Sequence, residues 1–257
     1  DSDPLYNATP IVDALRRIKS ARELTLIEKA IEITSSAHVR AAQALRPGLK
    51  EYELQAVIEG EFLKQGALLS AFPSIVGGGV KSTVLHYVEN NRVLEESDLV
   101  VVDIGAEYGY YAADLTRTYP VGGRYSQRQK EIYECVLEAQ AYAASIAKPG
   151  MFLRNVTAKE QSLHWLVVEF FKKRGLEKYF PHGLGHYMGL DVHDVGTYLE
   201  PLQPGDVFTI EPGLYLRDEA IGVRIEDDYL VTAKEVRCLS AALPKKIEEL
   251  EQLTKNF

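Results

Sequence analysis

The sequence has few of the features that define several common classes of protein. It contains only two cysteines in 257 residues, Cys135 and Cys238, which excludes a disulfide framework and is typical of a reducing cytoplasm. No apolar run approaches the ~20 residues that a membrane-spanning helix needs. A net charge of −8 without a Lys/Arg stripe argues against a nucleic-acid surface. We therefore expect a cytoplasmic protein that binds neither membranes nor nucleic acid.

The length and composition are those of a globular chain. The 257 residues suffice for one large domain or two small ones, and 46% of them are hydrophobic, enough for a substantial core. The chain begins Asp1-Ser2-Asp3-Pro4 without an initiator methionine. We therefore expect further sequence upstream of residue 1.

The two halves of the chain repeat one order of local patterns. Capping boxes at Ser20–Glu23 and Ser126–Gln129 each begin a long predicted helix, which a Pro-Gly pair ends. A second helix, a histidine-bearing segment and two acidic strands follow in each half. The second helices are predicted at residues 51–64 and 155–173, and a closing helix at 244–255. This similarity at one long period indicates a duplication of about residues 18–118 and 126–231, folded as one α+β domain.

Acidic residues end apolar strands in both halves. Asp103 and Asp114 lie in one predicted hairpin, and Glu211 and Glu226 lie in the other. Isolated carboxylates are costly to bury unless a cation or a proton compensates them. Four of them, with a histidine-rich segment between the two pairs, predict a metal site.

The turns of these hairpins set which acids face each other. A first turn centred at Tyr108-Gly109 would place Asp103 opposite Asp114. A second turn near Asp218-Glu219 would place Glu211 opposite Glu226. Directly opposed side chains have Cβ atoms ~4.5–5.5 Å apart, so their like charges repel unless something positive lies between them.

The predicted ligand types indicate the metal and its chemistry. Four carboxylates with one imidazole suit Mn²⁺, Co²⁺, Fe²⁺ or Zn²⁺. Two ions ~3.5–4 Å apart would neutralise most of the charge. Because metal-bound water ionises near pH 7, such a site supplies a nucleophile without an activated serine or cysteine. The pattern predicts a hydrolase.

The six histidines fall into three pairs. His182-Gly-Leu-Gly-His186 has the spacing of a metalloprotease helix but lacks its glutamate, and its glycines favour a strand or loop. One of these histidines is expected to bind metal and the other to face substrate. His86 and His193 lie about equally far upstream of the acid that ends the strand in their half, so they are candidate counterparts on a polar wall. His38 and His164 fall in predicted helices and receive no role.

These residues, in their contexts, closely resemble the aminopeptidase P and prolidase family. The contexts are VVDIGAEYGYYAADLTRT, HGLGHYMGLDVHD, TIEPGLY and VRIEDD, and the resemblance runs from about Ile18 to Val231. The family consists of dinuclear metallopeptidases of the pita-bread fold that cleave Xaa-Pro bonds. The resemblance therefore implies a mainly antiparallel curved sheet covered by helices, a peptide substrate, two divalent ions with Mn²⁺ first among them, and a homodimer.

The resemblance assigns five ligands. Asp103 would chelate one metal ion, and His186 with Glu211 would hold the other. Asp114 and Glu226 would bridge the two ions. Glu211 would also carry the proton from the nucleophile to the leaving nitrogen. All five ligand types are present, which argues against the metal-free members of the fold.

The resemblance also assigns a substrate pocket. His86, His182 and His193 would line it and take part in catalysis. Arg224 and Tyr215 would orient the substrate, and His193 would help to stabilise the developing oxyanion. Proline selectivity depends on the resemblance alone.

The domain assignment and two alternatives complete the expectations. Residues 1–257 are predicted to form a single catalytic metallopeptidase domain, with residues 1–17 as a linker from a domain upstream. A methionine aminopeptidase shares the metal ligands and is one alternative. A non-catalytic peptide-binding member of the same fold is the other. Preference for dipeptides or longer peptides stays open at this point.

Overall fold

The computed structural model describes residues 7–255. Its α-helices are α1 (Thr9–Arg17), α2 (Ala21–Ala44), α3 (Glu51–Lys64), α4 (Gln127–Ile146), α5 (Leu163–Lys172) and α6 (Ile247–Leu253). Its strands are β1 (Leu69–Ser70), β2 (Ile75–Gly78), β3 (Leu99–Ile104), β4 (Ala106–Tyr108), β5 (Tyr111–Ala112), β6 (Leu115–Pro120), β7 (Val207–Ile210), β8 (Gly213–Leu216), β9 (Ile221–Arg224), β10 (Asp227–Val231) and β11 (Val236–Cys238). Four short 3₁₀ helices are η1 (Gly79–Thr83), η2 (Lys159–Gln161), η3 (Glu177–Tyr179) and η4 (Arg217–Glu219).

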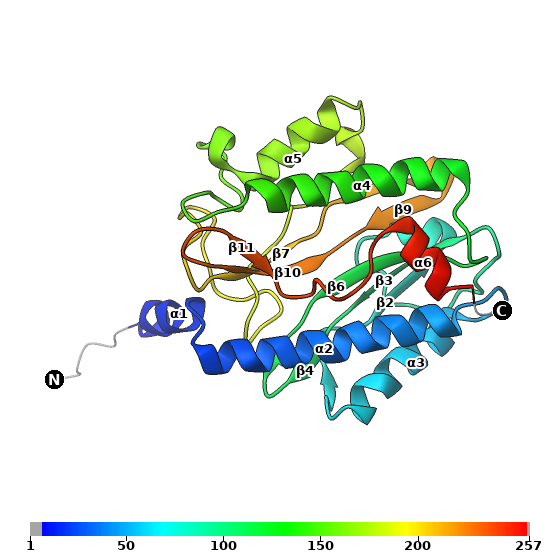
Figure 1. The fold of residues 1–257 in the computed structure, drawn as a ribbon, viewed down its shortest axis with the longest axis horizontal. Coiled ribbons are helices and arrows are strands. Elements are labelled where there is room, and N and C mark those ends of the chain that lie inside the picture. The colour runs from blue at the N-terminus through cyan, green and yellow to red at the C-terminus, as the bar shows by residue number, and fades with distance from the viewer. Residues whose placement is uncertain (1–6, 256–257) are drawn as a thin grey trace.

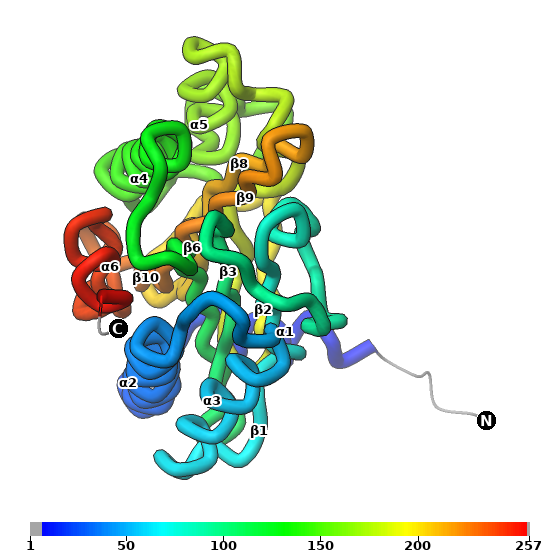
Figure 2. The backbone as a smooth tube through the Cα atoms, turned by 90° about the vertical axis from the view of Figure 1, so that its right-hand side faces the viewer, coloured from blue at the N-terminus to red at the C-terminus, as the bar shows by residue number. Residues whose placement is uncertain are grey.

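Helices from the two halves enclose the strands. In Figure 1, α2 and α3 of the first half run below the strands, and α4 and α5 of the second half run above them. Figure 2 shows α2, α4 and α6 along one side of the strands, with α3 and α5 at the two ends. One hydrophobic cluster contains Val102 of β3 and Ile210 of β7, so the core is continuous between the halves. This is the α+β architecture that the sequence predicts.

The strands form antiparallel ladders that meet at the junction of the two halves. β2, β3 and β6 make one ladder, and β7, β10 and β11 make another. A bridge between Thr116 of β6 and Glu226 connects them. The acidic residues of the first half are therefore brought against those of the second.

The register of the first hairpin differs from the prediction. Asp103 pairs with Thr116, not with Asp114. The turn is Gly109-Tyr110, both at positive φ (57° and 72°), and it follows the last pair, Tyr108 with Tyr111. The predicted turn was one residue too early, which moves every partner by two residues. Because side chains alternate with period two, Asp103 and Asp114 still share a face, as diagonal neighbours.

The register of the second hairpin is as predicted. Gly213 pairs with Arg224, and Ile210 pairs with Asp227 on the other side of a short break. Both pairs have the offset that places Glu211 opposite Glu226. The turn is η4, closed by Ala220 in the left-handed conformation.

Most predicted helices are confirmed. Both capping boxes are formed, at Ser20 for α2 and at Ser126 for α4, and α3 has the predicted bounds. The helix predicted at 155–173 is wrong at its beginning, since α5 starts only at Leu163. The Asn155 side chain accepts hydrogen bonds from the backbone N–H groups of residues 157 and 158, which favours a turn over a helix there. The closing helix is likewise shorter, 247–253 instead of 244–255.

Residues 1–17, the predicted linker, fall in two parts. Residues 1–6 lie outside the described residues. The rest contains α1, whose last residue, Arg17, is buried and bonded to Asp206 through Nε at 2.9 Å. Within residues 7–255, no helix combines the length and the apolar composition that would allow it to cross a membrane.

Candidate metal centre

A pocket of about 570 Å³ opens where the two halves meet. Its walls carry nine of the ten predicted site residues: His86, Asp103, Asp114, His182, His186, His193, Glu211, Arg224 and Glu226. The tenth, Tyr215, is buried and lies behind the wall, where its hydroxyl contacts Arg224 and His182. The structure thus brings together the residues that the sequence analysis selected from both halves.

Three of the predicted ligands form the centre of the cluster. Ligand atoms of Asp114, His186 and Glu226 all lie within 4.8 Å of one another. His186 Nε2 is 3.2 Å from Asp114 Oδ2 and 3.6 Å from Glu211 Oε1. The other ring nitrogen, Nδ1, is 3.1 Å from the Tyr187 carbonyl, which can only accept a hydrogen bond. This fixes the proton on Nδ1 and directs the Nε2 lone pair at the carboxylates.

Several carboxylate oxygens of the site have no hydrogen-bond partner among the described residues. Asp103 Oδ2 accepts a hydrogen bond from Arg224 at 2.5 Å, whereas its Oδ1 has none. Glu226 Oε2 accepts a hydrogen bond from Thr116 at 2.7 Å, whereas its buried Oε1 has none. Asp228 Oδ1 is a third such atom. Buried oxygens without a donor are rare because they are costly, and a bound cation would compensate them.

The pKa values of several of the site carboxyl groups are raised, because these groups are buried close to one another. Burial raises the pKa of Asp114 well above its usual value, and Asp103 and Asp228 raise it further. Burial also raises the pKa of Glu226, with Asp114 adding to the shift. Burial raises the pKa of Glu211 as well. The folded protein therefore favours protonated carboxyl groups here unless another positive charge enters the cluster.

The donor set fits divalent metal ions. The carboxylate oxygens and one imidazole nitrogen are the ligand types that Mn²⁺, Co²⁺, Fe²⁺ and Zn²⁺ accept. Asp103 and Glu226, which carry unpartnered oxygens, line the same pocket as His186. The residues present therefore suit the ions that the sequence predicts.

A hydrogen-bonded chain forms one wall of the pocket. Arg224 donates to the Tyr215 hydroxyl at 2.9 Å, and that hydroxyl lies 2.9 Å from His182 Nε2. His182 Nδ1 is 2.8 Å from the Gly183 carbonyl and must be its donor, so Nε2 accepts from Tyr215. Burial and the Arg224 charge lower the pKa of His182 to about 3. The imidazole is neutral at physiological pH, and its orientation is set by this chain.

The other two pocket histidines lie on loops. The His193 ring meets the His186 ring edge-on, with centroids 4.1 Å apart. Burial and His186 lower the pKa of His193, so this ring is also neutral near pH 7. His86 lies in the exposed segment after η1 and faces the pocket.

The structure adds neighbours that the sequence did not single out. Thr116 binds Glu226 and also accepts a 3.3 Å hydrogen bond from Arg224 Nε. Asp228 accepts from the backbone N–H of Asp114 at 3.2 Å, and Thr209 donates to Glu211 at 3.4 Å. Thr116 and Asp228 lie in the quoted acidic motifs, two residues from a predicted ligand. That spacing, which keeps a strand residue on the same face, was the available signal.

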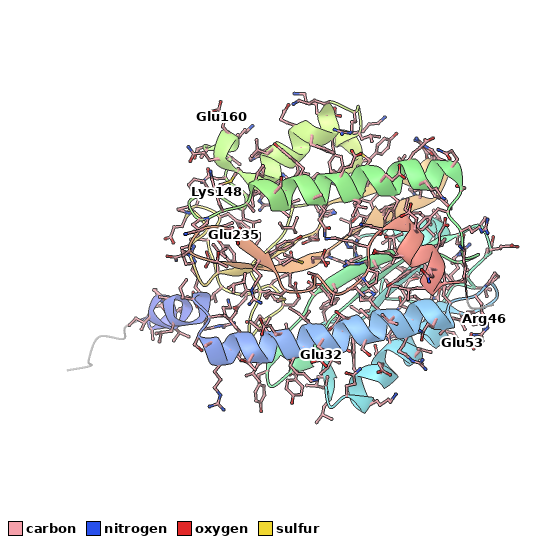
Figure 3. All side chains as sticks on the ribbon, in the orientation of Figure 1. Glu32, Arg46, Glu53, Lys148, Glu160 and Glu235 are labelled. Carbon is pink, nitrogen blue, oxygen red and sulfur yellow. The ribbon has the colours of Figure 1, made fainter. Side chains whose placement is uncertain are left out.

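Many other charged side chains lie at the surface of the molecule. Figure 3 labels six exposed ones around the periphery of the molecule: Glu32, Arg46, Glu53, Lys148, Glu160 and Glu235. By contrast, Asp103, Asp114 and Glu226 are only 7%, 6% and 1% exposed. These three site acids are therefore buried, unlike the six labelled charged residues.

Comparisons with known proteins agree with this geometry. The profile of a family described as metallopeptidase family M24 matches residues 25–233. The Xaa-Pro aminopeptidase of Haemophilus influenzae is 40% identical over 95% of this chain and 62% of that protein. The Xaa-Pro dipeptidase of Pyrococcus furiosus is 42% identical over 86% of this chain and 62% of that protein.

Solved structures show the same similarity. Escherichia coli aminopeptidase P in complex with substrate superposes with a TM-score of 0.89 at 38% identity, covering 96% of this chain and 62% of that one. The zinc-substituted form of that protein, in complex with product, gives a TM-score of 0.88. This chain therefore spans about three fifths of the length of these relatives.

Proposed function

Because this chain belongs to metallopeptidase family M24, we propose that it is a metal-dependent exopeptidase. The proposed reaction is hydrolysis of the Xaa-Pro bond at the N-terminus of peptides or in dipeptides. The names of the aminopeptidase and dipeptidase relatives support the Xaa-Pro preference. The observation that carries the proposal is the buried cluster of Asp114, His186 and Glu226, whose ligand atoms lie within 4.8 Å of one another.

Five residues would hold the ions. Asp103 would bind one ion and His186 with Glu211 the other, while Asp114 and Glu226 would contact both. When bound, two divalent ions would supply Lewis acidity toward the scissile carbonyl and a hydroxide nucleophile near neutral pH. We propose Mn²⁺ as the working ion, with Co²⁺, Zn²⁺ and Fe²⁺ as the other candidates for this donor set.

Glu211 is the proposed proton carrier. Its carboxylate lies at the edge of the ligand cluster, 3.6 Å from His186 Nε2 and 3.9 Å from His182 Nδ1. Burial raises its pKa, which makes the carboxylate a stronger base than an exposed glutamate. Glu211 would take a proton from the attacking nucleophile and deliver it to the leaving imino nitrogen.

The histidine and arginine side chains would bind and orient the peptide. The neutral His182, held by Tyr215 and Arg224, presents a fixed ring edge to the pocket. His193 would donate a hydrogen bond to the carbonyl oxygen as negative charge develops on it. His86, which comes from the first half of the chain, would also contact the substrate. These roles separate binding of the peptide from binding of the metal.

We also propose the state in which the chain works. It would act as a single catalytic domain, as a homodimer, in the cytoplasm. The free thiols of Cys135 and Cys238 are consistent with a reducing compartment. Light scattering of the purified protein would measure the subunit number, and a monomer at all concentrations would exclude the dimer.

A substrate panel tests the proposed function. The purified protein with added Mn²⁺ is assayed on Xaa-Pro dipeptides, longer Xaa-Pro peptides and Met-Ala peptides. We expect turnover of Xaa-Pro substrates, its loss with a chelator, and its return with Mn²⁺. Preference for Met-Ala peptides would indicate a methionine aminopeptidase. Binding of Xaa-Pro peptides without turnover would indicate a non-catalytic member of the fold.

A further inference from the structure

A buried ion pair lies immediately behind the loop that carries His193. Lys19 precedes α2, and its Nζ is 3.0 Å from Oδ2 of Asp194, the residue after His193. Both side chains are only 1% exposed. The pair therefore connects the segment before α2 to the neighbour of a pocket histidine, 175 residues away along the chain.

Lys19 is held in place by hydrogen bonds of its backbone and its side chain. Its backbone N–H donates to the Gly205 carbonyl at 3.1 Å, and Nζ also donates to the Arg17 carbonyl at 3.3 Å. Arg16 contacts the second carboxylate oxygen of Asp194, so both oxygens are held by cations. Burial lowers the pKa of Lys19, and the Asp194 charge opposes that shift. The carboxylate thus favours the charged form of the ammonium in this position.

The His193 loop is held by contacts outside regular secondary structure. Besides the Lys19–Asp194 pair, Arg16 contacts Asp191 at 2.6 Å, and Val192 packs against a hydrophobic cluster. Residues 188–206 contain no named helix or strand. The Asp194 backbone N–H donates to the Tyr187 carbonyl at 2.8 Å, which closes the loop at its base. A Cβ at Gly189 would lie 2.1 Å from Asp194 Oδ2 and 2.8 Å from Lys19 Cε, so the pair packs directly on the Gly189 backbone. The Lys19–Asp194 contact therefore fixes the loop from its buried side.

His193 itself has no side-chain hydrogen bond to any of the residues that the structure describes. Its ring only rests edge-on against His186. The direction of the ring must therefore come from the backbone of residues 192–194. Of these residues, Asp194 is the one that is tied to a buried cation.

We propose that Lys19 is a positioning residue, which holds the His193 ring toward the metal cluster through Asp194. The inference rests on the proposed Xaa-Pro hydrolysis, because His193 is proposed to act on the substrate in that reaction. A buried pair is costly to desolvate, but once formed it is directional, and removal of Lys19 leaves Arg16 as the cation that contacts Asp194. Lys19 lies just after residues 1–17, the predicted linker, and before α2, so the support of the active site would begin at that point of the chain.

Kinetics of three variants test the proposal. Lys19→Met removes the ammonium and keeps the length, Lys19→Arg keeps the charge, and Lys29→Met removes an exposed ion pair of α2 as a matched control. We expect kcat to fall about 10- to 100-fold in Lys19→Met, as a misplaced group would cause, with KM and metal content little changed. Lys19→Arg should recover most of the loss, and Lys29→Met should equal the parent.

A double-mutant cycle distinguishes positioning from general destabilisation. In a His193→Ala background, Lys19→Met should cause no further loss of kcat, because the ring to be positioned is gone. An equal loss in both backgrounds would overturn the proposal. If Lys19→Met does not fold, Lys19→Met combined with Asp194→Asn removes both charges of the buried pair and carries the same expectation.

A measurement without metal or substrate separates this inference from the proposed function. In metal-free protein, the ring ¹³Cε1–¹H signal of His193, whose proton does not exchange with water, should be sharp in the parent and Lys19→Arg once it is assigned with His193→Asn. It should shift and broaden in Lys19→Met. An unchanged signal in Lys19→Met would overturn the positioning role even if Xaa-Pro hydrolysis is confirmed. A changed signal in a protein without Xaa-Pro activity would reject the proposed function alone.

Discussion

At the scale of single residues, the site is shaped by carboxylates whose pKa values are raised. A carboxyl group with a folded pKa above its unfolded value stabilises the protein below the unfolded value, and that contribution is lost as the pH rises through the folded one. Asp114 and Glu226 are both of this kind. Without metal, their crowding therefore reduces stability at neutral pH, and bound cations reverse this penalty.

The first prediction concerns Asp114→Asn. The variant should lose peptidase activity and metal affinity, because Asp114 is the proposed ligand of both ions. Its metal-free form should be more stable than the parent at pH 7, by about 1 kcal/mol or more, since each pKa unit corresponds to ~1.4 kcal/mol. Metal analysis and denaturation with a chelator measure the two effects, with Glu32→Gln as an exposed control. Two ions bound per chain in the variant would contradict the ligand assignment.

The second prediction concerns His193→Ala. The variant should keep both ions, because its ring is assigned to the substrate and not to the metal. Turnover should fall about 100- to 10,000-fold, the range for loss of a group that acts on the reacting atoms. Metal content measured beside kcat checks both statements. A collapse of metal content would show that the ligand and pocket histidines have been exchanged.

At the scale of elements, the two acidic hairpins differ in how well their sequences specify the turn. The second hairpin follows the register predicted from the residues around Asp218 and Glu219. The first hairpin does not follow its predicted register, because Tyr110 adopts a positive φ, which sequence patterns associate with glycine or asparagine. The positive φ of Tyr110 therefore places the turn one residue later than predicted, so that Thr116 and not Asp114 lies opposite Asp103.

The third prediction follows from that turn. Tyr110 is 78% exposed, so its ring contributes little burial, while its left-handed backbone costs about 1 kcal/mol. Tyr110→Gly should stabilise the protein by about 0.5 kcal/mol after the entropy that glycine loses on folding. Tyr110→Ala, which keeps the Cβ, should bring no gain. Urea unfolding compares the midpoints, and a destabilised glycine variant would show that the ring is needed.

The fourth prediction concerns the contact between α2 and β6. His38 is fully buried, with Nε2 3.0 Å from the Leu115 carbonyl and Nδ1 3.1 Å from the Tyr119 hydroxyl. Burial, followed by the Arg117 charge, lowers its pKa to about 3. The unfolded chain then binds one more proton below pH ~6.5, so stability falls as the pH falls from there toward the folded pKa, by up to ~1.4 kcal/mol per unit.

His38→Gln removes this titration and is the means of testing it. The difference in unfolding free energy between parent and variant should change with pH between about 6.5 and 4 by close to one proton. The metal-site carboxylates titrate in both proteins and cancel in the difference. A pH-independent difference would show that folded His38 binds a proton as readily as the unfolded chain does, and would contradict the lowered pKa.

Local sequence patterns predicted the elements well where capping and apolar periodicity agree, as in α2 and α4. They failed at Asn155, where a side-chain turn replaces the first part of the predicted helix. The candidate ligands could be selected because carboxylates on apolar strands are costly to bury. The partners of those ligands, such as Thr116 and Asp228, could not be selected, because threonine and aspartate at such positions are common in proteins that have no metal site there.

At the scale of the whole molecule, the pocket depends on contact between the two halves of the chain. Thr116 of the first half bridges to Glu226 of the second, and Arg224 of the second half binds Asp103 of the first. Neither half alone places the carboxylates of both hairpins in one pocket. The proposed activity is therefore a property of the assembled domain.

Anomalous diffraction from crystals grown with Mn²⁺ tests this account most directly. It should show two peaks ~3.5–4 Å apart, with Asp114 and Glu226 contacting both and Asp103, His186 and Glu211 completing the two sites. Diffraction that shows no manganese in the pocket, or manganese bound only by residues of one half, would contradict it.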